Sequence, residues 1–266
     1  MSDDFFLRNQ RTTAIITGGA QGLGFAIAER LAREGAHGII LSGRSLDKGE
    51  KAAASIQSRG TDCLFVKADV SIPEDCFRLV SKALERFGTV NGLVNAAALP
   101  DRGTLLDTSP ELLDRMFHTN VRGPFLLMQG VVRHLIETGQ PGSIVNILSM
   151  VVHCGQSYLT PYSASKGALA TLTKNVANAF AAKRIRCNGI LTGWMDTSGE
   201  SVTQQKFHGA GADWLAQAEA AQPMGQLVKK TDQLAGLVAY LLSPESGVMT
   251  GALVDYDQHV AGAYPE

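Results

Sequence analysis

The sequence predicts a single α/β domain built around a doubly wound, mainly parallel sheet of seven strands. Short apolar runs rich in β-branched residues alternate with longer stretches of helical periodicity, a pattern typical of βαβ units. The first run leads directly into a glycine-rich turn and then a helix. Because no linker, repeat or low-complexity tract interrupts this alternation, we expect one domain over residues 1–266.

The elements are predicted in chain order from apolar periodicity and turn residues. A strand at 13–17 is followed by a helix at 23–34, whose apolar residues recur at spacings of three and four until Gly35 ends it. The alternation continues with strands at 38–42, 63–67, 92–95, 143–148, 186–191 and 252–255, and with helices near 46–58, 74–87, 111–137, 162–181 and 231–242. Residues 198–226 break the rhythm, with a short helix near 214–221, and we predict a small substrate lid there.

Composition and charge exclude several classes of protein. The chain has 24 basic and 25 acidic side chains and 45% apolar residues, which favours neither a disordered protein nor an electrostatic nucleic-acid binder. The longest stretch without a charged residue, 138–165, contains Pro141, Asn146 and Pro161, so it does not resemble a membrane span. The N-terminus lacks the pattern of a secretory signal, and we expect a cytoplasmic protein.

Cysteine and histidine spacing favours no metal site. The four cysteines lie at least 13 residues apart, so small apolar core positions explain them better than a zinc site or a disulfide framework. No two histidines have the spacing that would place them on one helix face. We therefore expect no structural metal.

The turn from Thr17 to Gly24 predicts a dinucleotide site and thus a Rossmann-type domain. In a strand–turn–helix context, Gly18 permits the sharp turn, Gly22 lets backbone amides approach a pyrophosphate, and Gly24 lets helix and strand pack closely. The positive end of the helix then faces the phosphates. A glycine-rich turn without a ligand is the alternative interpretation.

The end of the second strand favours NADP, with NAD possible. NAD-binding proteins usually place a carboxylate there, whereas this chain has Ser42, Gly43, Arg44 and Ser45. Arg44 is suited to bind a 2′-phosphate, with a hydroxyl from Ser42 or Ser45, although it is also explained as a solvated surface charge. Asp47 is better explained as a favourable charge at a helix N-terminus.

A phenol and an ammonium, Tyr162 and Lys166, lie four residues apart and thus on one face of the predicted helix. A tyrosine pKa near 10 must fall by about three pH units for proton exchange at neutral pH, which corresponds to about 4 kcal/mol. A unit charge about 4 Å away at an effective dielectric of about 20 supplies that energy. Ser149 follows the strand at 143–148, where its hydroxyl can polarise a carbonyl oxygen. An exposed helix pair and a strand-end cap are the alternatives.

With these motifs the chain resembles the short-chain dehydrogenase/reductase family over essentially its whole length. The resemblance rests on the Thr17–Gly24 turn, Asp69-Val70, Asn95, Asn120, Ser149 and Tyr162-x-x-x-Lys166. It implies that Tyr162 donates or accepts the proton, and that Lys166 lowers the pKa of Tyr162 and holds the nicotinamide ribose. It also implies that Ser149 orients the substrate oxygen and that Asn120 supports a water relay. The predicted cofactor contacts combine the residues inferred from the turn and from the second strand end with those that the resemblance implies: Gly18, Gln21, Gly22, Leu23, Gly24, Ser42, Arg44, Asp69, Val70, Asn95, Ala96, Ala97, Tyr162, Lys166, Gly193 and Thr197.

The chain departs from the family pattern at four places. The family's N-N-A-G reads N-A-A-A from Asn95, and the usual P-G before the lid reads Thr192-Gly193. Gln21 stands where NADP-using relatives often carry a basic residue, which weakens the case for NADP. The C-terminal V-D-G-G reads V-D-Y-D and ends at Asp257.

The expected function is hydride transfer between a nicotinamide cofactor and a secondary alcohol or ketone. Polar side chains in the segments expected to line the substrate site favour a small hydroxylated compound such as a sugar or polyol, with Ser149, His153 and Trp194 as substrate contacts. The alternatives are a non-catalytic dinucleotide-binding regulator, a reductase of apolar ketones, and dehydratase or epimerase chemistry. The resemblance implies a homo-oligomer, either a dimer or a tetramer, with no nucleic-acid or membrane partner.

Overall fold

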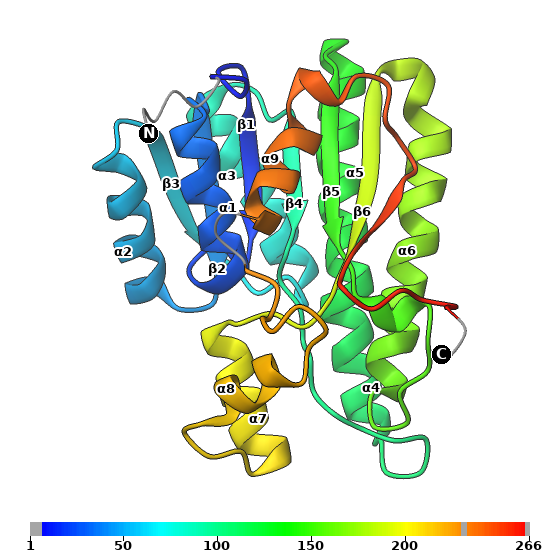
Figure 1. Cartoon of the computed structure of the whole chain (residues 1–266). Helices are drawn as coiled ribbons and strands as arrows, with labels where there is room; N and C mark the ends of the chain where they lie inside the picture. Colours follow the sequence, from blue (N-terminus) through cyan, green and yellow to red (C-terminus); the bar gives the residue numbers. More distant parts are fainter. Residues whose placement is uncertain (1–6, 230–232, 264–266) are drawn as a thin grey trace.

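The sheet of the computed structural model, which describes residues 7–229 and 233–263, has seven strands in the order β3-β2-β1-β4-β5-β6-β7 (Figure 1). The strands are β1 (Thr13–Thr17), β2 (Gly38–Gly43), β3 (Asp62–Lys67), β4 (Gly92–Asn95), β5 (Gly142–Ile147), β6 (Ile185–Thr192) and β7 (Leu253–Tyr256). Each neighbouring pair is parallel. The strand order reverses between β1 and β4, as in doubly wound folds that bind ligands at this point. The predicted fold class is confirmed.

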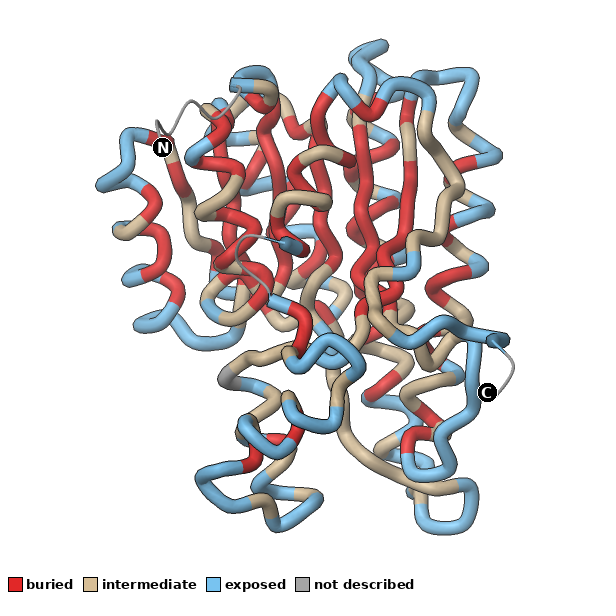
Figure 2. Tube along the Cα trace, in the orientation of Figure 1, coloured by how far each residue is buried: buried red, intermediate tan, exposed pale blue. Residues whose placement is uncertain are grey.

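Helices cover both faces of the sheet. One face carries α1 (Gly22–Arg33), α2 (Leu46–Gln57) and α9 (Ala235–Leu242), and the other carries α3 (Pro73–Phe87), α5 (Gly123–Thr138) and α6 (Thr160–Phe180) (Figure 1). Each face has its own apolar core, because the strands alternate their side chains between the two layers. Figure 2 shows the buried chain concentrated in the strands and on the inner sides of the helices.

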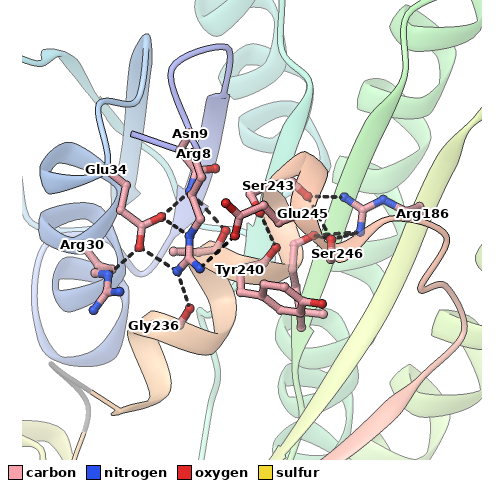
Figure 3. Close-up of polar contacts among 12 residues, drawn as sticks. Arg8, Asn9, Arg30, Glu34, Arg186, Gly236, Tyr240, Ser243, Glu245 and Ser246 are labelled. Atoms are coloured by element: carbon pink, nitrogen blue, oxygen red, sulfur yellow. Dashed lines mark hydrogen bonds and ion pairs between the residues drawn. The ribbon is translucent and has the colours of Figure 1, made fainter. Parts of the chain in front are cut away.

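A buried carboxylate fastens the N-terminal segment to α9 (Figure 3). The Glu34 side chain is only 1% exposed and accepts hydrogen bonds from Arg8 at 2.7 Å, Asn9 at 2.6 Å and Arg30 at 2.6 Å. Asn9 also donates to the carbonyl of Ala239, 230 residues away in the sequence. The residues before β1 and the helix near the C-terminus are therefore held together by one polar cluster.

Two short helices project beyond the carboxyl edge of the sheet (Figure 1). They are α7 (Ser198–His208) and α8 (Trp214–Ala220), and they occupy the segment predicted as a lid. The chain enters and leaves this segment side by side, because Met195 and Val228 form a parallel bridge and Val228 N donates to Trp194 O at 2.9 Å. Gln258 adds a second tie by bonding the backbone at Met224 and Gln226.

Two predicted details differ from the structure, and one lies partly beyond what it describes. The helix predicted over 111–137 is α4 (Pro110–Phe117), a π-helical turn η1 (His118–Arg122) and then α5. The helix α7 was not predicted. Part of the helix predicted at 231–242 lies outside the described residues.

The predicted core role of the cysteines holds for three of the four. Cys63, Cys76 and Cys187 are buried, whereas Cys154 is exposed. Within the described chain, no helix combines the length and apolar character needed to cross a bilayer.

Candidate active site

The predicted site residues gather at the carboxyl edge of the parallel sheet. The glycine turn follows β1, Asn95 ends β4, Ser149 follows β5, and Gly193 follows β6. Because all of these strands run in the same direction, their carboxyl ends meet at one edge. The topology therefore brings together residues that are far apart in the sequence.

The turn after β1 has the backbone shape that its glycines predict. Gly18 and Gly22 have φ angles of +67° and +59°, which side chains disfavour. A Cβ on Gly24 would overlap the carbonyl of Gly18. A Cβ on Gly22 would meet no atom within 4 Å, so the space beside this glycine is open. No side chain caps the start of α1, so its first amides are available to a ligand. These amides can hold a pyrophosphate.

Thr17 is a structural residue of the site that the sequence reasoning did not single out. Its hydroxyl accepts hydrogen bonds from the amides of Ala96 and Ala97, each at 3.0 Å, and so joins the turns after β1 and β4. Asn95 donates to Asn146 Oδ1 at 2.8 Å, while its own Oδ1 is buried with no partner among the described residues. The feature of the sequence that could have identified Thr17 is a hydroxyl-bearing residue at the end of the first strand, directly before the first glycine.

The adenosine end of the predicted site is open and carries positive charge. Arg44 is exposed beside a groove of about 740 Å³ that Asp69 also lines. Lys48 Nζ donates to Gln21 Oε1 at 3.1 Å, which places a second cation over the glycine turn. Ser45 caps α2, whereas the Ser42 hydroxyl is buried with no partner among the described residues. These groups are compatible with an adenosine that carries a phosphate.

The predicted reacting residues converge. Tyr162, in the first turn of α6, and Ser149 line the same cavity, and Ser149 lowers the pKa of the Tyr162 phenol. Lys166 lies one turn further along α6. The residue is 2% exposed, and its Nζ lies 5.6 Å from the centre of the Tyr162 ring. The same Nζ donates to the carbonyl of Ile147 at 2.7 Å. The helical spacing thus places the phenol, the ammonium and the serine in one cluster.

The expected acidity of the phenol is not found in the protein alone. Burial raises the pKa of Tyr162 to about 12, against smaller lowering effects from Ser149 and Arg102, and Glu200 raises it further. Burial also lowers the pKa of Lys166 to about 8. Both shifts have the same cause, which is that burial removes solvent from the charged form of each group. That Lys166 lowers the Tyr162 pKa stays a prediction.

Asn120 lies in the π-helical turn η1, and its side chain is fully engaged. Its Oδ1 accepts from the amide of Leu99 at 2.8 Å. Its Nδ2 donates to the carbonyl of Leu99 at 3.1 Å and to Ser165 Oγ at 3.0 Å. The side chain thus holds the loop after β4 against α6, and the role of Asn120 in a water relay stays a prediction.

A cavity of about 540 Å³ adjoins Ser149 and Tyr162. Trp194 lines it, as predicted, and is held by a hydrogen bond from Nε1 to Glu200 at 2.9 Å and by a ring contact with Trp214. His153 is absent from its wall and lies 2.8 Å from Asp255, so the structure adds no support to its predicted role as a substrate contact. Other polar wall residues come from the segments that were expected to line the substrate site, namely Gln156, Glu200, Gln204, His208 and Gln222. Arg102, Asp257 and His259 also line the cavity and lie outside those segments.

Among the described residues, no group of three or more His, Cys, Asp or Glu side chains is placed to hold a metal ion. The polar groups of the cavity are instead dispersed around its wall.

Comparisons with known proteins give consistent matches. The family model described as short chain dehydrogenase matches residues 12–208. The human protein named dehydrogenase/reductase SDR family member 2, mitochondrial, is 34% identical over 90% of this chain and 82% of its own length. A sorbitol dehydrogenase of Cereibacter sphaeroides is 31% identical over 94% and 98%. Among solved structures, an actinorhodin polyketide ketoreductase variant with NADPH superimposes with a TM-score of 0.88 at 26% identity, covering 96% of this chain and 99% of that one.

Proposed function

Because the chain belongs to the short-chain dehydrogenase/reductase family and is thus an NAD(P)-dependent oxidoreductase, we propose that it interconverts a small hydroxylated secondary alcohol and its ketone with NADP as the favoured cofactor. The observation that carries the proposal is the convergence of Tyr162, Ser149 and Lys166 beside a polar cavity, at the sheet edge that also bears the glycine turn.

The chain's own residues divide the work of binding and proton transfer. The first amides of α1 hold the pyrophosphate, and the buried Lys166 and the segment from Gly193 to Thr197 hold the nicotinamide end. When bound, the nicotinamide supplies or accepts the hydride. The Ser149 hydroxyl orients the substrate oxygen. The Tyr162 phenol, with a pKa of about 12, is protonated at neutral pH and donates its proton to the carbonyl oxygen during reduction.

The preference for NADP is supported by charge at the adenosine end. Arg44 presents a planar guanidinium suited to bidentate phosphate binding, and Lys48 adds a second cation over the glycine turn. The N-terminus of α2, capped by Ser45, faces the same region with its positive end. A structural neighbour that contains NADPH is consistent with this preference.

The hydroxylated substrate is supported by the wall of the cavity. Arg102 and Glu200 face the cavity, and Trp194 offers an aromatic face on which the C–H groups of a sugar or polyol can stack. The relative named as a sorbitol dehydrogenase is consistent with this class. An apolar ketone would displace solvent from these polar groups without offering them a hydrogen bond.

We further propose that the enzyme works in the cytoplasm as a homodimer or homotetramer. Phe125 and Ile136 are exposed on α5, and burial of such side chains favours association. Light scattering on the purified protein measures the number of subunits, and a monomer at all concentrations would contradict the proposal.

The decisive experiment compares the wild type with Tyr162→Phe in a nicotinamide absorbance assay with sorbitol and related polyols. Loss of the proton donor is expected to reduce turnover by about 100- to 10,000-fold. Tyr240→Phe, which removes a phenol from α9, is the matched control and keeps wild-type turnover. Equal rates for the wild type and Tyr162→Phe would refute the mechanism, and nucleotide binding without any turnover would identify a non-catalytic binder.

A further inference from the structure

The C-terminal tail places a carboxylate in the cavity at a position where the family pattern has glycine. Asp257 follows β7 directly, and Gly193 N donates to the carbonyl of Tyr256 at 2.9 Å, so the tail runs along the end of β6. Asp257 lines the same cavity as Ser149 and Tyr162. This departure from the family pattern therefore changes the chemistry of the substrate site.

The Asp257 carboxylate fits closely and has few partners. Its side chain is 10% exposed, and a Cβ on Gly193 would overlap its Oδ1, so the missing side chain at Gly193 makes room for it. Oδ1 accepts from the amide of Gln258 at 2.8 Å, and Oδ2 lies 3.7 Å from Nδ1 of His259. A carboxylate offers about four acceptor positions, and a nearly buried one is stabilised when they are filled. Asp257 thus has capacity for a further donor.

The strand register places Asp257 at the same edge of the sheet as Ser149. Ile147 pairs with Ile190 across β5 and β6, and Thr192 pairs with Tyr256 across β6 and β7. Ser149 and Asp257 therefore lie at one edge, two strands apart, which is about 10 Å between their backbones. Both residues line the same cavity, so one small substrate with two hydroxyl-bearing carbons can contact both.

We propose that Asp257 is a specificity-determining residue whose carboxylate accepts a hydrogen bond from a second hydroxyl group beside the reacting carbon of the substrate. The inference rests on the proposed function and names the recognition element behind it. Arg102 and Glu200 lie 3.8 Å apart and offset each other's charge, so Asp257 leaves this part of the cavity with an excess negative charge. A hydroxyl donor is favoured there over a carboxylate-bearing substrate.

The test compares alcohols that differ by one group. Oxidation of butan-2-ol, butane-2,3-diol and 3-aminobutan-2-ol is measured for the wild type, Asp257→Asn, Asp257→Gly and Asp255→Asn. The readout is the ratio of kcat/KM for the diol to kcat/KM for the mono-alcohol. A hydrogen bond to a charged group predicts that both Asp257 variants lower this ratio by about 10- to 100-fold. Asp255 is nearby on β7 but pairs with His153, so Asp255→Asn keeps the wild-type ratio.

The outcomes distinguish a failure of the Asp257 inference from a failure of the proposed function. Wild-type oxidation of butan-2-ol without a preference for the diol, or an unchanged ratio in both Asp257 variants, overturns the inference and leaves the oxidoreductase function intact. A stronger preference for the amino alcohol than for the diol overturns the assignment of a hydroxyl group. Absence of oxidation of all three compounds and of sorbitol removes the proposed function, and the inference falls with it.

Discussion

Replacing the buried ammonium of Lys166 by an apolar side chain is expected to stabilise the fold while removing activity. Burial lowers the pKa of this lysine from 10.5 to about 8, which corresponds to about 3 kcal/mol of unfavourable free energy at about 1.4 kcal/mol per pH unit. Lys166→Met removes that term but also the hydrogen bond to the carbonyl of Ile147, which contributes about 1 kcal/mol. The variant is therefore expected to gain about 2 kcal/mol of unfolding free energy at pH 7.

The gain has a defined pH dependence. Between pH 8 and pH 10.5 the unfolded wild type still binds the proton that the folded protein has released, so the stability of the wild type rises with pH across this window. Methionine does not titrate. The advantage of Lys166→Met is thus complete below pH 8 and lost by about pH 10.5, apart from the effect of the missing hydrogen bond.

Urea unfolding at fixed protein concentration, at pH 7 and at about pH 10, measures both effects. Lys174→Met, at an exposed position of the same helix α6, is the control and is expected to change the unfolding free energy by less than about 0.5 kcal/mol. A Lys166→Met variant that is less stable than the wild type at pH 7 would refute the reasoning. So would a difference in stability that is the same at both pH values.

Three further measurements address the other parts of the molecule. Burial holds the pKa of Tyr162 near 12, and alcohol oxidation needs the phenolate. The kcat/KM for alcohol oxidation should therefore rise between about pH 7 and pH 10, whereas the kcat/KM for ketone reduction should not. An oxidation profile that is flat over this range contradicts the reasoning. Arg44→Ala should weaken NADPH binding by about 10-fold and leave NADH binding unchanged in fluorescence titrations, and an equal loss for both would remove the 2′-phosphate contact. In urea unfolding, Glu34→Ala should lower the unfolding free energy by about 3 kcal/mol or more, because it removes the buried acceptor of Arg8. Glu245→Ala, at the exposed end of the cluster, should lower it by less than about 1 kcal/mol. Similar losses for the two variants would show that burial of the Arg8–Glu34 ion pair is unimportant.

Local signals were sufficient to predict most of the fold and the reacting cluster. The strand, glycine turn and helix from Thr13 to Arg33 are encoded in consecutive residues, and the spacing of Tyr162 and Lys166 fixes their common helix face. The π-helical turn at 118–122 was not predictable in this way, because one extra residue in a turn hardly disturbs an apolar pattern that spans 27 residues of predicted helix, from 111 to 137.

The parts of the site that sequence reasoning missed depend on contacts between distant segments. Asp257 reaches the cavity only because β7 pairs with β6, 64 residues earlier at the Thr192–Tyr256 pair. His153 pairs with Asp255, a partner from that same strand, and does not line the cavity. The pKa of Tyr162 depends on how deeply the folded chain encloses it, which no spacing of residues expresses.

The bridge between Met195 and Val228 makes the segment between these residues a natural unit for exchange between relatives. The two ends of this segment lie next to each other at the bridge. The helices α7 and α8 can therefore be lengthened, shortened or grafted from a relative without changing the register of any strand. A chimera joined at these two residues would replace Thr197 and the part of the substrate wall that α7 and α8 carry, while Ser149, Tyr162 and Asp257 would stay. Substrate use can therefore diverge through changes in this one segment while the sheet keeps its register.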